Sequence, residues 1–303
     1  MKKLLAVLLA LTMLFAFAAC GGDKTNTDAD QTQTDRTETA SLEILLEQGE
    51  DMKNTYSLIA CNPDKLEGIN TEGADAFIEW MTGSEASALI ADYGKEQYGQ
   101  PLFYLLDEAA KDDAAEETEA AEKPENSVIR ISTTTSVNDS GLLPYLLPTF
   151  EQKTGYTVEV QSAGTGAAIQ KAKDGNADLI LVHAKASEEE FVSEGYGVER
   201  IPFMYNYFVI VGPSDDPAGI SGCENAAAAF AKIRDAKATF ISRGDDSGTH
   251  KAENKIWGEN IPDTATETWY VSAGQGMGAC LTMAKQMNGY CLTDKATFLS
   301  MAE

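Results

Sequence analysis

The chain has 303 residues, of which 43% are hydrophobic, which is enough for one large or two smaller domains with a sizeable core. Its formal net charge of -25 makes nucleic acid and anionic membrane surfaces poor partners at long range. An anionic ligand would be repelled by the mean field as well, so its capture must rest on local donors that act at contact range.

The first twenty residues have the pattern of an export signal. Lys2 and Lys3 precede the apolar run 4–19, which is shorter than the about 20 residues that a membrane-spanning helix needs. Small residues directly before Cys20 resemble a bacterial lipobox, in which the cysteine is lipidated and becomes the mature N-terminus. We therefore expect residues 1–20 to be a signal peptide with a lipobox, and the protein to be anchored outside the cytoplasmic membrane through Cys20.

A polar tether and a short series of regular elements follow. Residues 21–40 are mostly polar, with many Thr, Asp and Gln, and predict a flexible tether. In the segment 41–106, apolar periodicity and turn signals predict an apolar-alternating stretch at 41–46, a strand at 54–60, helices at 71–81 and 84–93, and an extended stretch at 99–104.

An acidic run at 107–127 separates this segment from the rest of the chain. It is rich in Asp, Glu and Ala and has no apolar face, which predicts a solvated linker. Strands and helices then alternate through 128–303. The expected strands are 128–132, 156–161, 178–182, 207–211, 238–241 and 269–272, and the expected helices are 141–153, 167–173, 224–234, 250–257 and 277–286. This alternation predicts an α/β protein with mostly parallel sheets flanked by helices.

One turn in this segment has the composition of an anion site. The strand at 238–241 leads into the polar turn 242–249, which precedes a helix. A strand, a glycine-bearing turn and a helix start aim unpaired backbone N–H groups at one point. Arg243 adds an always-charged fork suited to a tetrahedral oxyanion, and Ser247 and Thr249 add hydroxyl donors. The alternative is an ordinary N-capped helix, since Asp, Ser and Thr are common cap residues.

Two other strand ends carry similar residues. Hydroxyl side chains follow a strand at 133–136, and Gly-Thr-Gly follows another at 164–166. In open α/β sheets the carboxyl ends of parallel strands face the ligand crevice. We therefore expect these two stretches and the turn 242–249 to converge on one site.

Several motifs between residues 128 and 289 are highly specific when taken together. They are Thr-Thr-Thr-Ser at 133–136, Asp-Ser-Gly-Leu-Leu at 139–143, Gly-Thr-Gly at 164–166, Ala-Asp-Leu-Ile-Leu-Val-His-Ala at 177–184, Gly-Tyr-Gly-Val at 195–198, the turn and helix start at 242–250, and Gly-Gln-Gly-Met-Gly-Ala at 274–279. With these motifs the segment resembles the tungstate-binding proteins of bacterial ABC uptake systems. The Thr-Asp-Arg element of that family stands here as Thr-Asp-Lys at 293–295.

The resemblance implies a two-lobed fold of the periplasmic-binding-protein type (type II) with a hinge between the lobes. It implies capture of tungstate or molybdate and delivery to an ABC permease, with no catalysis, no cofactor and no cation site, by a monomer. Tungstate has no proton at neutral pH, so its site needs only donors. The resemblance points above all to Arg243, Thr135, Ser136 and Thr165 as oxyanion ligands. The full set of expected ligand residues is Thr134, Thr135, Ser136, Thr165, Arg243, Ser247, Gly248 and Thr249.

The order of the segments departs from that of the family. Family members continue past the region corresponding to Gly289 into a closing part that resembles residues 41–106, but in this chain that part comes first. The simplest interpretation is a circular permutation, in which 41–106 completes the two lobes of 128–303 and the acidic stretch joins the family's usual ends. A rearranged gene is the alternative.

Two other functions stay open at this point. Phosphate receptors carry a similar turn, and phosphate keeps a proton that Asp245 or Asp246 could accept. A hydrolase could use Ser247 with His250, although triad geometry usually draws on separate loops.

Histidines and cysteines give weaker signals. His250 is expected to pack or to cap its helix, and His183 lies at a strand end near the cleft. The spacing of Cys61, Cys223, Cys280 and Cys291 is not that of a metal site, and free buried thiols are expected over a Cys280–Cys291 pair.

Overall fold

A computed structural model describes residues 41–47, 49–106 and 123–301. The expected signal peptide with Cys20, the tether 21–40 and residues 107–122 of the expected linker lie outside the described residues. The strands are β1 (Leu42–Glu47), β2 (Lys53–Ala60), β3 (Tyr104–Leu105), β4 (Val128–Thr134), β5 (Thr157–Ala163), β6 (Leu179–Val182), β7 (Ile201–Pro213), β8 (Phe240–Ser242), β9 (Tyr270–Ser272) and β10 (Tyr290–Asp294).

Helices lie between most of these strands. They are α1 (Thr71–Thr82), α2 (Ser84–Asp92), α3 (Lys95–Tyr98), α4 (Thr135–Asp139), α5 (Leu142–Thr154), α6 (Thr165–Lys173), α7 (Lys185–Ser193), α8 (Ala226–Ala236), α9 (Gly248–Trp257), α10 (Met277–Met287) and α11 (Lys295–Met301). In the part of the chain that the structure describes, none of these helices combines the length and the apolar character needed to cross a membrane.

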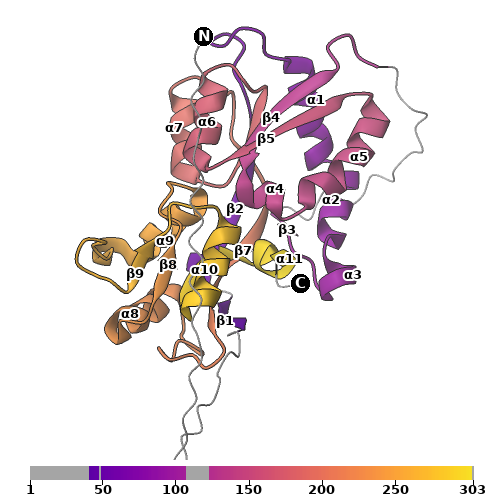
Figure 1. The fold of residues 1–303 in the computed structure, drawn as a ribbon. Helices are drawn as coiled ribbons and strands as arrows, with labels where there is room; N and C mark the ends of the chain where they lie inside the picture. Colours follow the sequence, from indigo (N-terminus) through magenta and orange to yellow (C-terminus); the bar gives the residue numbers. More distant parts are fainter. Residues whose placement is uncertain (1–40, 48, 107–122, 302–303) are drawn as a thin grey trace, which may run out of the picture. The chain divides into compact units, whose positions relative to one another are not determined.

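The strands join in the order β5-β4-β6-β2-β7-β10-β8-β9, and β1 and β3 also pair with β7 (Figure 1). In the first half, β4 runs parallel to both β5 and β6. Leu179 and Leu181 of β6 belong to one hydrophobic cluster and Ile180 and Val182 to another, so helices cover both faces. In the second half, β8 runs parallel to β9 and β10, and again two clusters flank it. The expected α/β class is confirmed.

The sheet is mixed, whereas the sequence predicted mostly parallel pairing. The difference arises at β2, which runs antiparallel to both β6 and β7. A strand from a distant part of the sequence is thereby inserted between two strands that are successive along the chain. β7 is also antiparallel to β10. The alternation of strands and helices along 128–303 carries no information about this insertion.

The segment 41–106 is built into the same sheet. Its strand β2 is buried along most of its length, and the apolar face of α1 packs into the cluster of the first half, as the periodicity of 71–81 predicted. Asn70 caps α1 by accepting a hydrogen bond from the Gly73 N–H at 3.0 Å. Its amide also donates to the Val128 carbonyl at 2.7 Å, which ties α1 to β4.

Several elements differ from the expected ones. β7 extends well beyond the expected 207–211, because β1, β2, β3 and β10 all pair with it. The helices α3, α4, α7 and α11 and the strand β10 were not predicted. α4 has only five residues, and α7 is rich in charged residues, so neither shows a clear apolar period.

Three of the four cysteines match the expected buried free thiols. Cys61, Cys280 and Cys291 are buried free thiols, and Cys223 is a partly exposed free thiol. Trp257 and Trp269 lie in the core of the second half.

Candidate anion-binding site

The turn between β8 and α9 is held in one conformation by local contacts. Gly244 adopts a φ of 60°, and a Cβ there would collide with the side chain of Ser272 in β9. The Asp245 carboxylate accepts a hydrogen bond from the Ser247 N–H at 3.2 Å. Ser247 caps α9, because its hydroxyl accepts from the His250 N–H at 3.2 Å. These contacts fix the backbone that carries the arginine of the turn.

Arg243 is buried and its donors are only partly used. Its exposed fraction is 3%. One terminal nitrogen donates to the Asp245 carboxylate at 2.6 Å and to the Thr135 hydroxyl at 3.4 Å. The Nε–H is buried and has no hydrogen-bond partner among the described residues. An unpaired buried donor on a charged group is costly, so this N–H is suited to a ligand acceptor.

The charge of Asp245 is stabilised in turn. Burial opposes its ionisation, but hydrogen bonds from Ser247 and the positive charge of Arg243 outweigh it and hold the pKa of Asp245 below its usual value. Asp245 is therefore ionised at neutral pH.

The start of α6 lies against the same turn. A Cβ on Gly166 would lie 3.0 Å from Oδ2 of Asp246, and one on Gly164 would lie 3.7 Å from the Asp245 carbonyl oxygen. Between these glycines, the Thr165 hydroxyl is buried without a hydrogen-bond partner among the described residues. The Thr249 hydroxyl, in the first turn of α9, is in the same state. Unpaired buried donors thus come from the turn and from the starts of both α6 and α9.

The start of α4 completes the set of expected residues. The Thr134 hydroxyl caps this helix by accepting from the Val137 N–H at 3.4 Å and lies 3.2 Å from the Ser136 hydroxyl. Thr135 reaches Arg243, as given above. The three stretches predicted to converge therefore contact one another, through Thr135 with Arg243 and through α6 with the turn.

A buried histidine lies beneath the site. His183, directly after β6, has its Nε2 3.1 Å from the Ser136 hydroxyl and its Nδ1 2.8 Å from Oδ1 of Asn54 in β2. It also lies close under α9, since a Cβ on Gly248 would lie 2.5 Å from its Cε1. Burial and, to a lesser degree, the positive charge of Arg243 lower the pKa of His183 to about 3. The imidazole is therefore neutral.

The sequence did not point to Asn54. The only signal was a carboxamide in a strand that is otherwise suited to burial. Its partner His183 lies 129 residues away, so the pair is recognisable only in the fold.

The serine hydrolase alternative finds no support in this geometry. Ser247 accepts from the backbone of His250, while the ring Nδ1 of His250 accepts from the Asp246 N–H at 3.1 Å. Ser136, His183 and Asn54 have the order of a catalytic triad. An imidazole with a pKa of about 3 is a poor base at neutral pH, so His183 is not suited to act as a general base.

The arrangement can bind an anion through donors. Arg243 supplies a charge, and the N-terminal turns of α6 and α9 supply hydroxyls and backbone N–H groups. Within the described ranges, no group of three or more His, Cys, Asp and Glu side chains has the geometry to hold a metal ion.

Comparison with known proteins places the chain in a family. A PBP superfamily domain matches residues 112–303. The chain belongs to the PBP superfamily. It is 51% identical to the tungstate-binding protein TupA of Peptoclostridium acidaminophilum over 175 residues, which cover 57% of this chain and 61% of that protein. It is 38% identical to the TupA of Campylobacter jejuni over 166 residues, covering 54% and 61%.

A solved structure described as the tungstate ABC transporter from Geobacter sulfurreducens is similar as well. Its sequence is 47% identical, the TM-score is 0.54, and the match covers 57% of this chain and 74% of that one. The chain spans 56% to 61% of the length of the curated relatives that it matches. All eight expected ligand residues lie inside the PBP superfamily domain, whereas Asn54 and the rest of β2 lie outside it.

Proposed function

We propose that this protein captures tungstate, or the chemically similar molybdate, and delivers it to the permease of an ABC transporter. The observation that carries the proposal is that Arg243 Nε, Thr165 Oγ1 and Thr249 Oγ1, at the turn and at the two helix starts beside it, are buried and have no hydrogen-bond partner among the described residues. Both oxyanions carry no proton at neutral pH and need only donors. The tungstate-binding relatives, at 51% and 38% identity, support the same ligand.

The remaining expected residues have supporting parts in this proposal. Thr135 holds Arg243, and Thr134 and Ser247 cap the helices whose first turns face the anion. Gly248 lets α9 lie close to His183, because it carries no side chain. The role is capture by closure of two lobes about a hinge, without catalysis.

Phosphate is the nearest competing ligand, and the acceptors it needs are already engaged. The Asp245 carboxylate accepts from Arg243 and from the Ser247 N–H. The Asp246 carboxylate is 3.4 Å from the Lys251 ammonium, and its side chain is largely exposed. A protonated oxyanion therefore lacks a free carboxylate here, which favours tungstate.

The cellular setting follows from the leader sequence. We propose a monomeric lipoprotein, held outside the cytoplasmic membrane by lipidated Cys20, that meets its permease there and binds no nucleic acid. The fit with extracytoplasmic binding proteins of ABC transporters supports the location.

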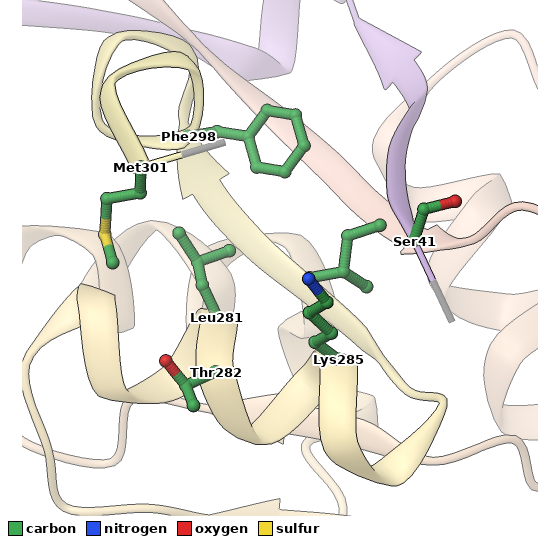
Figure 2. Close-up of a pocket in the computed structure, with 7 residues that line it drawn as sticks. Ser41, Leu281, Thr282, Lys285, Phe298 and Met301 are labelled. Carbon is green, nitrogen blue, oxygen red and sulfur yellow. The ribbon is translucent and has the colours of Figure 1, made fainter. Parts of the chain in front are cut away.

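We also infer that the chain is a circular permutant of its family. Support comes from β2, which lies between β6 and β7 although it precedes both by a long stretch of chain. The superfamily domain begins only at residue 112. The two ends of the described chain also border the same pocket. Ser41 and Met301 line one pocket of about 430 Å³, together with Leu281, Lys285 and Phe298 (Figure 2). A short connection there would restore the family's order.

Calorimetric titration of the purified protein with tungstate, molybdate, sulfate and phosphate tests the function. We expect one-to-one binding of tungstate or molybdate that is much tighter than binding of the other two. Heat from phosphate alone would assign the site to phosphate, and no heat from any of the four would overturn the proposal.

A further inference from the structure

A buried chain of polar side chains runs from the anion site into the sheet. It begins at Ser136, passes through His183 to Asn54, and ends on Tyr56 and Asn206. All five side chains are buried. The residues come from α4, the end of β6, β2 and β7, so the chain links both sides of the inserted strand.

The hydrogen bonds of Asn54 fix the direction of this chain. Its amide nitrogen donates to the Tyr56 hydroxyl at 2.8 Å and to Oδ1 of Asn206 at 2.9 Å. Its oxygen is therefore the atom facing His183, and it must accept from Nδ1–H at 2.8 Å. A neutral imidazole with a proton on Nδ1 has a bare Nε2. The Ser136 hydroxyl, 3.1 Å away, must donate to it.

This arrangement has two consequences for ligand binding. The Ser136 proton points at His183 and away from the anion, so Ser136 offers no donor in this state. The ring also supports the start of α9, because Gly248 lies directly over its Cε1. His183 is thus in contact with α4, β2 and α9 at once, while it does not supply a charge.

We propose that His183 is a positioning residue of the anion site, which orients Ser136 and the first turn of α9 through its Nδ1–H tautomer. This inference rests on the proposed function and deepens it. It divides the eight expected residues into direct donors, among them Arg243, Thr165 and Thr249, and a residue, Ser136, that acts through the histidine.

The tautomer can be read directly, without a ligand. The chain has only two histidines, so ¹⁵N labelling of histidine gives two ring systems, which the variant His250→Gln assigns. We expect His183 to carry its proton on Nδ1 and to stay neutral at pH 5. Since Nδ1 of His250 accepts from the Asp246 N–H, its neutral ring should show the opposite tautomer and serve as an internal reference. A protonated Nε2 on His183 at neutral pH would overturn the proposal.

Binding then tests the role. The variant His183→Phe keeps a ring among Tyr56, Phe208 and Gly248 but removes both hydrogen bonds. We expect it to weaken tungstate binding about tenfold, and His183→Gln, whose amide oxygen reaches the Nε2 position, to recover most of that loss. Ser136→Ala should weaken binding by a similar factor, and it should add less than about twofold in the His183→Phe background.

Thr165→Val is the matched control. Removing a direct donor should weaken tungstate binding by the same factor in the wild-type background and in the His183→Phe background. Near-UV circular dichroism confirms that each variant is folded. If the losses of tungstate affinity caused by Ser136→Ala and His183→Phe multiply in the double variant, as those of Thr165→Val and His183→Phe should, Ser136 binds the anion directly and the proposal is wrong. If His183→Phe binds like the wild type, it is also wrong. If the wild-type protein binds none of the four oxyanions, the proposed function is wrong. The tautomer of His183 can still be measured in that case and tests the orientation of Ser136 independently.

Discussion

Two arginine–aspartate pairs, Arg130–Asp178 and Arg243–Asp245, show how the same chemistry serves structure in one place and binding in the other. In the first pair every guanidinium nitrogen is engaged, with the Asp178 carboxylate and with the carbonyls of Gly68 and Gly175. In the second, one terminal nitrogen serves Asp245 and Thr135, and Nε is left unpaired among the described residues. A saturated arginine holds a fold together, whereas an unsaturated buried arginine is prepared for a ligand.

The position of each pair fits this division. Asp178 also accepts from the backbone N–H groups of Asn70 and Arg130, at 2.9 and 2.7 Å, so it joins the start of α1 to β4. Asp245 lies in a turn whose partners are the starts of α6 and α9. The first pair connects the segment 41–106 to the sheet, and the second connects the elements around the anion.

The largest effect is expected from Arg243→Ala. It removes the only charged donor of the three unpaired ones, and truncating one partner of a buried charge pair with a ligand costs on the order of 2 to 5 kcal/mol of binding free energy. Tungstate affinity should fall about thirtyfold or more by calorimetry. Arg234→Ala, at an exposed arginine paired with Asp235, is the control and should bind normally. Equal affinity in both variants would remove Arg243 from the site.

Arg130→Ala should lower the stability of the protein and leave its tungstate affinity unchanged. It leaves the Asp178 carboxylate buried without its partner, and breaking a buried pair in this way costs about 3 kcal/mol of unfolding free energy. Urea unfolding measures the loss, and at a low urea concentration the folded protein should bind tungstate with unchanged affinity. A variant that is as stable as the wild type, or one that is folded but does not bind, would contradict the assigned division.

Local sequence patterns were enough to predict those parts of the fold and of the site that depend only on residues close together in the sequence. The apolar period of 71–81, the strand before Arg243 and the glycines around Thr165 all predict their structure from neighbouring residues. What these patterns could not show depends on pairing over long distances. β7 is long because four strands pair with it, and the contact between Asn54 and His183 spans 129 residues. α4 was missed because five residues are too short for a helical period.

The smallest effect is expected from restoring the family's order of segments. In such a variant residues 41–106 follow residue 303 through a short Gly-Ser connection, and the chain begins near residue 123. The contacts of β2 with β6 and β7 do not depend on which segment comes first, and Ser41 and Met301 already border one pocket. Only loop closure changes, which is worth about 1 kcal/mol or less for loops of similar length.

We therefore expect the reordered protein to unfold at nearly the same urea concentration and to bind tungstate with nearly the same affinity as the native order. The informative control is the chain with residues 41–106 deleted, which removes the strand between β6 and β7 and the residue Asn54 that orients His183. That deletion should not fold. If the reordered protein also failed to fold while the native order did, the position of 41–106 in the chain would matter as much as its contacts, and the permutation would be wrong. If both orders fold and bind alike, the contacts that residues 41–106 make with the sheet, including those of Gly68 and Asn70 with the Arg130–Asp178 pair, do not depend on where the segment stands in the chain.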